Sequence, residues 1–337
     1  MSHRPLASLS LDLDNLWSYM KTHGDPGWES FPSYLDIVVP RFLHLLADNN
    51  LKITVFVVGQ DAALSKNRKA LASIPQAGHE IANHSFHHEP WLHRRNRAQL
   101  ASEISDAEDA IHEATGIRPI GFRGPGYSLS EDVLEVLASR GYAYDCSTFP
   151  TYIGPLARAY YFMSAGLSSK QKEERDILFG SVRDGLRPLH AYRWILGDLR
   201  LVEIPVTTMP VLKAPFHFSY LHWLAGFSDA LADRYFRLAL RVCRVGGIEP
   251  SLLLHPLDFM GKDDLAELAF FPGMTQTAQV KLNRMQRWLA IFAERYNVLP
   301  MGEYTRVLSE RALRERKPDF RSGGHSTIAD VSGQSTA

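Results

Sequence analysis

The sequence predicts an α/β fold, a distorted barrel of seven (β/α) units that carries aromatic-rich insertions. Short β-branched or apolar runs bounded by turn residues indicate strands, and longer helix-compatible stretches separate them. Repeated alternation of strand and helix requires parallel strands, and one barrel accommodates seven units better than two separate domains. The expected strands lie near residues 8–14, 52–58, 79–84, 119–123, 142–146, 201–206 and 251–255.

Three segments between these runs have clear helical patterns, at residues 34–49, 97–114 and 131–140. Gly116 and Gly141 follow the second and third of them. Glycine is favoured just after the C-terminal end of a helix because it adopts the left-handed conformation without a steric penalty. These positions therefore indicate where the two helices end.

Two stretches do not fit the repeating unit, at residues 151–194 and 209–236, and both are rich in aromatic residues. We expect them to be insertions, either lids that pack across the mouth of the barrel or binding surfaces. From about Arg316 onward, Gly, Ser and Thr accumulate without periodicity, which predicts a disordered tail. The expected organisation is one domain, residues 1–315, followed by a tail, residues 316–337.

Composition excludes several classes of function. The chain has 337 residues with 37 Lys plus Arg and 37 Asp plus Glu, so no global positive field exists to attract nucleic acid. Its two cysteines, Cys146 and Cys243, are too few for a disulfide framework and are expected to be thiols. No secretory signal and no run of about 18–20 apolar residues is present, which predicts a cytoplasmic protein whose membrane contact, if any, is peripheral.

Ionisable residues stand at the ends of five of the seven predicted strands. In a β/α barrel the carboxyl ends of the strands meet at one mouth, where reacting groups lie. Charged groups at the ends of apolar strands are costly unless they serve one another or a ligand. Asp12 and Asp14 end the first run on the same side of the strand, and the other ends carry His84 and His88, Arg123, Asp145 and His255.

A metal site is the first prediction from this set. His84 and His88 stand four residues apart, so on a helical turn both rings would face one ion, and Asp14 could supply a third ligand. Two imidazoles and one carboxylate leave open positions for water and substrate, which is typical of a catalytic divalent site. Zinc is the expected ion, with Co²⁺, Ni²⁺ and Mn²⁺ as alternatives. His87 is expected to point elsewhere, and His93 to be a solvated surface residue.

The motifs resemble those of a known family. Asp12-x-Asp14, His84-Ser85-x-x-His88, Arg123-x-Pro125, Asp145 and Leu254-His255-Pro256, in that order, are similar to the five motifs of the polysaccharide deacetylases, carbohydrate esterase family 4 with its NodB-homology domain. The resemblance covers about residues 8–257. It implies a distorted seven-stranded β/α barrel, in agreement with the strand count.

The resemblance also implies a role for each residue. Asp14, His84 and His88 would bind the metal ion, Asp12 would be the general base, and Arg123 would hold Asp12 ionised. His255 would be the general acid, and Asp145 would orient it. A metal ion lowers the pKa of water toward about 7, and a backbone N–H such as that of Gly126 would stabilise the oxyanion by about 3 kcal/mol. His255 suits protonation of the leaving amine near neutral pH.

Two features depart from the family pattern. The first motif is Asp-x-Asp and not the adjacent Asp-Asp of many extracellular members, which resembles the divergent intracellular branches. The tryptophan that usually follows the fourth motif is missing, so Phe149 or Tyr152 is expected to line the acyl pocket.

Each assignment has a structural alternative. Asp12 and Asp14 could cap backbone N–H groups at the strand end, and Asp145 could cap a turn. Arg123 could form a purely structural ion pair, and His255 could be a core histidine with its polar atoms satisfied. The alternatives are correlated, because one correct catalytic assignment makes the others more plausible.

The predicted function is metal-dependent removal of an N-acyl group, acetyl or formyl, from an amino sugar. A cytoplasmic enzyme would meet such sugars as nucleotide-linked or polyprenyl-linked precursors. One alternative is a hydrolase of small cyclic or linear amides, similar to allantoinase. The other is a catalytically inactive member that binds glycan or membrane.

A lipid carrier would need an apolar landing surface. We expect peripheral contact with the inner face of the membrane through residues 152–163 and 216–224, which contain interfacial aromatic residues near basic ones. The residues are Tyr160, Tyr161, Phe162, Phe216, Phe218, Tyr220, Trp223 and Leu224, with Arg158, Lys170, Lys172 and Lys213 beside them.

Overall fold

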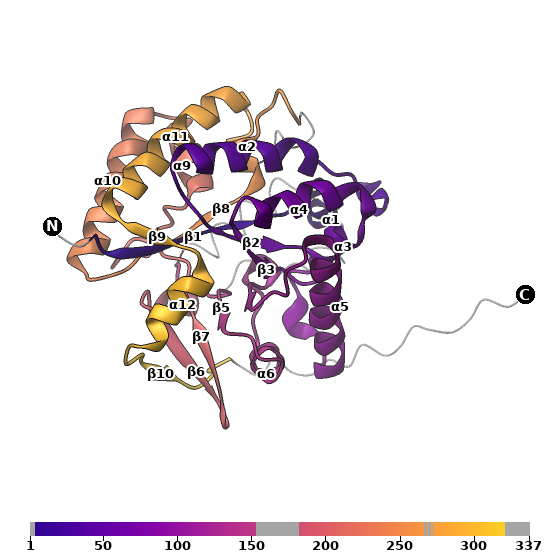
Figure 1. Cartoon of the computed structure of the whole chain (residues 1–337). Coiled ribbons are helices and arrows are strands. Elements are labelled where there is room, and N and C mark those ends of the chain that lie inside the picture. The colour runs from indigo at the N-terminus through magenta and orange to yellow at the C-terminus, as the bar shows by residue number, and fades with distance from the viewer. Residues whose placement is uncertain (1–3, 153–181, 266–267, 269–270, 272, 321–337) are drawn as a thin grey trace, which may run out of the picture.

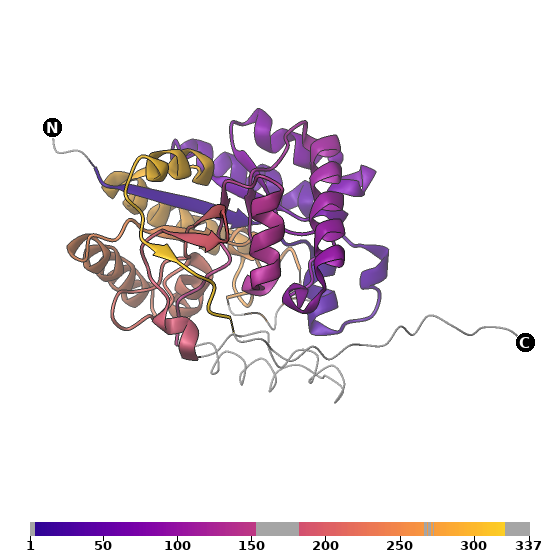
Figure 2. The ribbon, with the colours of Figure 1, turned by 90° about the horizontal axis from the view of Figure 1, so that it is seen from below.

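A computed structural model describes residues 4–152, 182–265, 268, 271 and 273–320 (Figure 1). Helices surround a single central sheet, in which β1 is a long strand next to the edge strand β8 (Figure 2). None of the helices in the described ranges is both long enough and apolar enough to span a bilayer.

Seven parallel strands form the main part of the sheet, in the spatial order β8-β1-β2-β3-β4-β5-β7. Each overlaps one of the runs expected from the sequence, because these runs are apolar and buried on both faces. The strands are β1 (Leu6–Asp12), β2 (Thr54–Val57), β3 (Glu80–Asn83), β4 (Gly121–Phe122), β5 (Tyr144–Asp145), β7 (Leu199–Glu203) and β8 (Ser251–Leu254).

The predicted count of seven strands is not confirmed, since the sheet has ten strands among the described residues. The additional strands are β6 (Tyr192–Leu196), which forms an antiparallel hairpin with β7, β9 (Asn297–Leu299), which pairs with β1, and β10 (Glu315–Arg316), which pairs with β6. The antiparallel pair makes the sheet mixed. The α/β class is confirmed.

The barrel is distorted because no pairing between strands of the described residues closes it. The sheet path ends at β10 on one side and β8 on the other. Just beyond β7, the Thr207 N–H donates to the Ser251 carbonyl at 2.9 Å, and the Ser251 N–H donates to Thr207 Oγ1 at 2.8 Å. These two hydrogen bonds bring the chain after β7 against the start of β8.

The three helices predicted from the sequence are present as α2 (Leu35–Asp48), α5 (Arg97–Thr115) and α6 (Glu131–Ser139). Asn96 and Gln99 form a capping box at the start of α5, and Gly116 ends that helix in the left-handed conformation with φ 75°. The other helices are α1 (Leu16–His23), α3 (Gly59–Ala63), α4 (Arg68–Gln76), α9 (Phe218–Ala225), α10 (Asp229–Val245), α11 (Ala278–Arg295) and α12 (Met301–Ser309).

Strand β1 shows how the sequence positions the site. Leu9 and Leu11 are buried against helix residues such as Phe42 of α2, and burial of each such side chain contributes about 1.5–3 kcal/mol. The alternate residues Ser10 and Asp12 are buried polar side chains on the opposite face. The period of two therefore places Asp12 inside the barrel while the leucines hold the strand in the core.

The C-terminal part of the chain completes the fold. Asn49, just after α2, donates a hydrogen bond to Gln286 of α11 at 3.0 Å, and the two helices lie near each other (Figure 1). Phe320 packs on Trp194 of β6 with the ring centroids 5.8 Å apart. The folded part thus continues beyond residue 315, where the sequence predicted its end, and residues 321–337 lie outside the described ranges.

Candidate active site

The strand register brings the predicted residues into one row. Leu11 of β1 pairs with Leu254 of β8, so Asp12 and His255 follow on adjacent parallel strands. Asn83 of β3 pairs with Phe122 of β4, so His84 and Arg123 also follow side by side. Phe122 in turn pairs with Asp145 of β5. Because the strands are parallel, all five residues lie at the same edge of the sheet.

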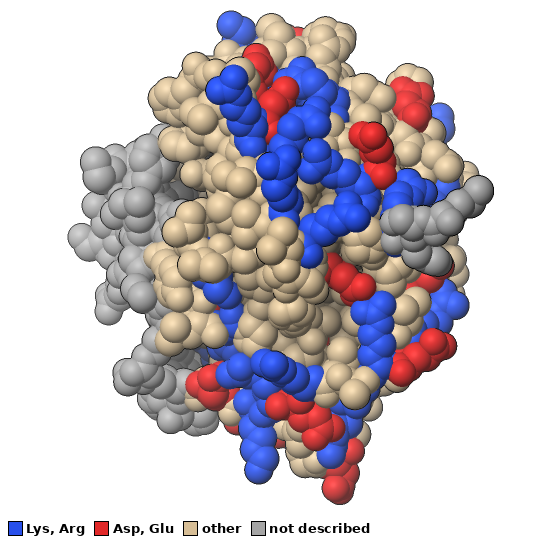
Figure 3. Space-filling view, turned by 90° about the vertical axis from the view of Figure 1, so that its left-hand side faces the viewer, with Lys and Arg blue, Asp and Glu red and all other residues tan. Residues whose placement is uncertain are grey.

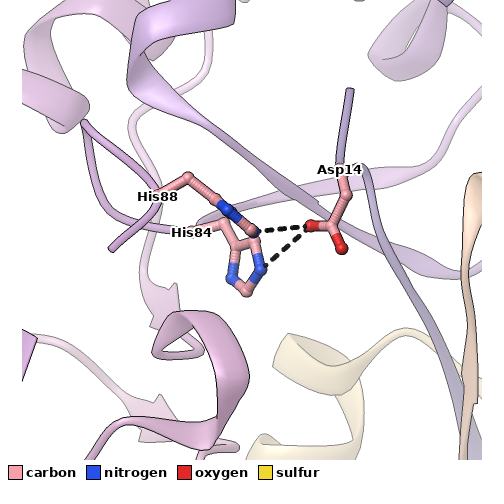
Figure 4. A group of neighbouring side chains, drawn as sticks. All are labelled: Asp14, His84 and His88. Carbon is pink, nitrogen blue, oxygen red and sulfur yellow. Dashed lines mark hydrogen bonds and ion pairs between the residues drawn. The ribbon is translucent and has the colours of Figure 1, made fainter. Parts of the chain in front are cut away.

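Asp14, His84 and His88 form a compact cluster with one ligand atom each, all within 4.8 Å of one another (Figure 4). Asp14 Oδ1 lies 2.9 Å from His88 Nε2 and 3.3 Å from His84 Nε2. All three residues are buried. Two imidazole nitrogens and one carboxylate oxygen in this arrangement suit a divalent ion such as zinc.

The outer contacts of His84 fix which nitrogen faces the cluster. His84 Nδ1 lies 2.7 Å from the Arg123 carbonyl, which can only accept a hydrogen bond. Nδ1 therefore donates to this carbonyl, and Nε2 is the nitrogen that faces Asp14.

The two histidines do not lie on a helical turn, so that prediction is wrong. Residues 84–88 form an irregular loop after β3, in which Ser85 and His88 have positive φ values of 63° and 52°. The Asn83 side chain accepts the Ser85 N–H at 2.8 Å, and Ser85 Oγ accepts the His88 N–H at 3.2 Å. These bonds fold the loop back so that the ring centroids of His84 and His88 are 5.1 Å apart.

Neighbouring charged groups shift the pKa values of Asp14 and His84. Burial alone would raise the pKa of Asp14, but His88 and His84 lower it, and the net pKa lies well below the ordinary value. For His84, burial acts to lower the pKa, but the Asp12 and Asp14 carboxylates raise it above the ordinary value. A carboxylate that stays ionised is ready to bind a cation.

A buried polar network holds the segment that carries Asp14. Asn15 caps α1 by accepting the Leu16 N–H at 2.9 Å, and its amide donates to Asp61 Oδ1 at 2.7 Å. Trp17 Nε1 donates to the same oxygen at 2.9 Å. Burial raises the pKa of Asp61 to about 7. The sequence did not single out Asp61, because it lies inside α3 rather than at a strand end.

Asp12 forms a buried ion pair with Arg123. The Arg123 Nη1 donates to Asp12 Oδ1 at 2.6 Å and to Ser10 Oγ at 3.0 Å, while Nε donates to the Cys146 carbonyl at 3.0 Å. The guanidinium lies 4.3 Å from the centre of the Phe56 ring. Burial opposes the charge of Arg123, but Asp12 raises its pKa above the ordinary value. The contact between Asp12 and Arg123 therefore agrees with the role predicted for Arg123 and equally with the alternative of a structural ion pair.

Asp145 has partners that the sequence did not predict. Its carboxyl accepts the Ser147 hydroxyl at 2.6 Å and the Ser147 N–H at 3.1 Å, and it shares a hydrogen bond with Glu203 of β7. Burial raises the pKa of both Asp145 and Glu203, so this acid pair retains a proton above the usual carboxyl range. The contacts of Asp145 thus do not support its predicted role of orienting His255.

His255 contacts a different set of residues. Its Nδ1 lies 3.1 Å from Ser219 Oγ of α9, and its backbone N–H donates to Asp258 Oδ2 at 2.8 Å. The ring of His217 lies 6.0 Å away, centroid to centroid. No sequence pattern marked Ser219 or His217, apart from their place in an insertion. Asp258 stands only three residues after His255, so its proximity to that residue was visible in the sequence.

Aromatic side chains near the carboxyl ends of the strands contact one another. Tyr127 stacks on Phe149 with the centroids 4.9 Å apart, and Phe149 lies 5.9 Å from the His217 ring. Phe149 is therefore better placed than Tyr152 to line an acyl pocket, since Tyr152 lies against Gly185. Gly126 adopts a φ of 57° in the turn before Tyr127, which favours glycine there.

The predictions for the neighbouring histidines had opposite outcomes. His87 points away from the cluster and contacts Glu103 at 2.7 Å, as predicted. His93 is not a solvated surface residue, because it is half-buried, its Nδ1 lies 2.7 Å from Ser128 Oγ, and burial lowers its pKa to about 4.

The predicted membrane surface requires correction. Phe216 and Phe218 are fully buried and pack on Phe236, with centroids 6.5 and 5.9 Å away, so they are core residues. The sequence analysis counted them among interfacial aromatic residues near basic ones, but both side chains are buried in the core. Trp223 is 40% exposed. Of residues 152–163, only Tyr152 lies within the described ranges, and Arg158, Tyr160 to Phe162, Lys170 and Lys172 lie outside them.

Comparison with known proteins shows which family part of the chain resembles. The family model described as "Polysaccharide deacetylase" matches residues 25–144, which include His84, His88 and Arg123. Over this segment, about a third of its length, the chain is similar to the polysaccharide deacetylases. The match does not extend to Asp12, Asp14 or His255, so the placement of those residues rests on the structure alone.

Among the proteins similar to this chain is a peptidoglycan deacetylase of Helicobacter pylori, 25% identical over 61% of this chain and 66% of that protein. A chitooligosaccharide deacetylase of Sinorhizobium fredii is 34% identical over 32% of this chain and 49% of that protein. The chain thus spans less than two thirds of the length of these relatives. A crystal structure from Mycobacterium smegmatis, named as a polysaccharide deacetylase, shares the fold with a TM-score of 0.59 at 20% identity, covering 94% of this chain and 98% of that one.

Proposed function

We propose that this protein is a divalent-metal-dependent hydrolase that removes an N-acyl group, acetyl or formyl, from an amino sugar. The observation that carries the proposal is the convergence of Asp14, His84 and His88 beside Asp12 and His255 at one edge of the sheet. The names of the relatives, deacetylases of peptidoglycan and of chitooligosaccharides, support an acetylated amino sugar as the substrate class.

Zinc is the ion that we propose for the Asp14, His84 and His88 cluster, with Co²⁺, Ni²⁺ and Mn²⁺ as alternatives. The donor set fits, because two neutral imidazoles and a carboxylate kept ionised by its neighbours are typical ligands of catalytic zinc. Bound there, the ion would polarise the acyl carbonyl and make water more acidic.

The protein groups would carry the proton transfers. Asp12 accepts a proton from the attacking water, and the Arg123 guanidinium at 2.6 Å holds the carboxylate in place. The backbone N–H of Gly126 is the proposed donor to the oxyanion. His255 then donates a proton to the amide nitrogen, so that the C–N bond breaks with a neutral amine as the leaving group and a carboxylic acid as the other product.

We further propose a cytoplasm-facing glycan precursor, nucleotide-linked or polyprenyl-linked, as the substrate. The chain differs from the motif pattern of extracellular family members in two features, its Asp-x-Asp first motif and the absence of a tryptophan after Asp145. The aromatic residues Tyr127 and Phe149 support a sugar rather than a small amide, because sugar rings stack on aromatic faces.

Peripheral contact with an anionic membrane is part of this proposal and rests on α9 and α10. Trp223 and Phe227 are 40% and 73% exposed. Along α10, Arg234, Arg237, Arg241 and Arg244 recur every three or four residues on the exposed side, and none has an ion pair in the described part of the chain. Lys and Arg side chains gather on this side of the molecule (Figure 3). Arginines beside exposed apolar side chains suit an anionic interface.

Vesicle binding tests the membrane contact. Trp223→Ser with Phe227→Ser should weaken co-sedimentation with phosphatidylglycerol vesicles by roughly tenfold or more. Ile120→Ser, at another exposed apolar residue, is the control and should leave binding unchanged. Equal binding by all three proteins would remove this part of the proposal.

The deciding experiment for the activity is incubation with polyprenyl-linked and nucleotide-linked N-acyl sugars, peptidoglycan fragments, chitooligosaccharides and allantoin, followed by mass spectrometry. Loss of an acetyl or formyl group that stops on addition of a chelator would support the proposal. Turnover of allantoin alone would favour the small-amide alternative. Binding of glycan without turnover of any compound would favour an inactive member.

A further inference from the structure

His255 has a defined environment around Nδ1 that nothing in the motif pattern assigned. Ser219 Oγ, from the first turn of α9, lies 3.1 Å from Nδ1 although it stands 36 positions earlier in the sequence. The insertion at residues 209–236 thus reaches into the site. It contributes a polar side chain to the predicted acid.

Asp258 lies behind this pair. It is almost fully buried, its Oδ2 accepts the His255 N–H at 2.8 Å, and its carboxyl also shares a hydrogen bond with Ser219. Burial raises the pKa of Asp258, while the neighbouring charges of His255 and Lys281 oppose that rise. The carboxyl group of Asp258 therefore lies near both His255 and Lys281.

The donor inventory fixes the direction of these bonds. An ionised carboxylate only accepts, so the single hydroxyl proton of Ser219 is donated to Asp258. Ser219 Oγ is then free to accept from Nδ1–H of His255. With Nδ1 protonated, the other ring nitrogen, Nε2, is the one that can exchange a proton with substrate.

We infer that Ser219 and Asp258 are positioning residues that hold His255 through its Nδ1–H, so that the doubly protonated ring gives its Nε2 proton to the leaving nitrogen and becomes the neutral ring with Nδ1 protonated. This inference rests on the proposed function. It gives to Ser219 and Asp258 the role that the motif pattern assigned to Asp145, whose carboxyl is engaged with Ser147 and Glu203. In this inference neither residue contacts substrate.

A comparison of two leaving groups tests the inference in the full chain loaded with zinc. Ser219→Ala should lower kcat for acetate release from penta-N-acetylchitopentaose by about 10- to 100-fold, with KM changed by less than about twofold. Hydrolysis of 4-nitrophenyl acetate should change by less than about twofold, because 4-nitrophenolate leaves without being protonated. Ser219→Thr, which keeps the hydroxyl, should restore most of the amide activity.

Two further variants sharpen the comparison. Asp258→Asn should lower the amide rate selectively, as Ser219→Ala does. Asp145→Asn should change the amide and ester rates in the same proportion, because Asp145 does not contact His255. If Ser219→Ala lowers both rates equally, or if Asp145→Asn alone is selective for the amide, the inference is wrong.

A spectroscopic readout separates this inference from the proposed function. In ¹⁵N-resolved NMR of the neutral imidazoles, Nδ1 of His255 should carry the proton in the unmodified protein, and Ser219→Ala should shift the proton toward Nε2. That shift would support the positioning role even if the chain cleaves neither substrate, in which case only the proposed function fails. An Nε2-protonated ring in the unmodified protein would overturn the inference.

Discussion

Removal of the buried Arg123 charge is expected to destabilise the fold strongly. Arg123 is fully buried, and its guanidinium donates to Asp12 at 2.6 Å and to the Cys146 carbonyl at 3.0 Å. Arg123→Met keeps most of the aliphatic volume but leaves Asp12 as an unpaired buried charge. Breaking a buried pair in this way costs about 3–5 kcal/mol, and the lost hydrogen bond to the carbonyl adds about 1 kcal/mol.

Urea unfolding measures this cost as the change in the free energy of unfolding. The double variant Asp12→Asn, Arg123→Met should recover about 2 kcal/mol or more of the loss, because no unpaired charge remains. Arg68→Met is the matched control. Its partner Glu113 and Arg68 itself have 72% and 51% exposed side chains, so the control should cost less than about 1 kcal/mol. A loss in Arg123→Met no larger than in the control would refute the buried ion pair.

Two further outcomes follow from the structure. Asp145 and Glu203 have raised pKa values, so the native state holds a proton that the unfolded chain releases above about pH 4. The contribution of this pair to stability is therefore present below that pH and is lost as the pH rises. Glu203→Gln should flatten the fall in melting temperature between pH 5 and pH 8, and an unchanged slope would argue against the shared proton. Gly59→Ala should lower the free energy of unfolding in urea by about 1–3 kcal/mol, because a Cβ there would lie 2.8 Å from the Ala107 Cα. Gly246→Ala is the control and should be nearly neutral, since the nearest neighbour of its Cβ would be 3.3 Å away. Equal effects of the two substitutions would show that α3 and α5 can separate.

The strand positions and their terminal residues could be predicted from the sequence because local patterns determine them. Apolar runs indicate buried parallel strands, and the parallel arrangement then brings Asp12, His84, Arg123 and His255 to one edge of the sheet. Asp14, His84 and His88 were grouped correctly, although the helical turn on which the two histidines were placed is absent from residues 84–88.

Other features depend on tertiary contacts that no local pattern reveals. Strand β9 has only three residues and is defined by its pairing with β1. Phe216 and Phe218 looked like surface residues, but packing on Phe236 makes them part of the core. Ser219 reaches His255 only through the fold of α9, and the loop of residues 84–88 takes its shape from positive φ angles that the sequence does not indicate.

The most direct test of the central claim is zinc binding to the metal-free protein, measured by isothermal titration calorimetry. One ion per chain should bind the unmodified protein, and His88→Ala should weaken binding by at least about 100-fold, more than loss of an outer partner usually does. His87→Ala is the matched control, because His87 contacts Glu103 instead of the cluster, and it should bind zinc normally. Equal affinity in all three proteins, or no binding in any, would contradict the proposal that Asp14, His84 and His88 hold one ion.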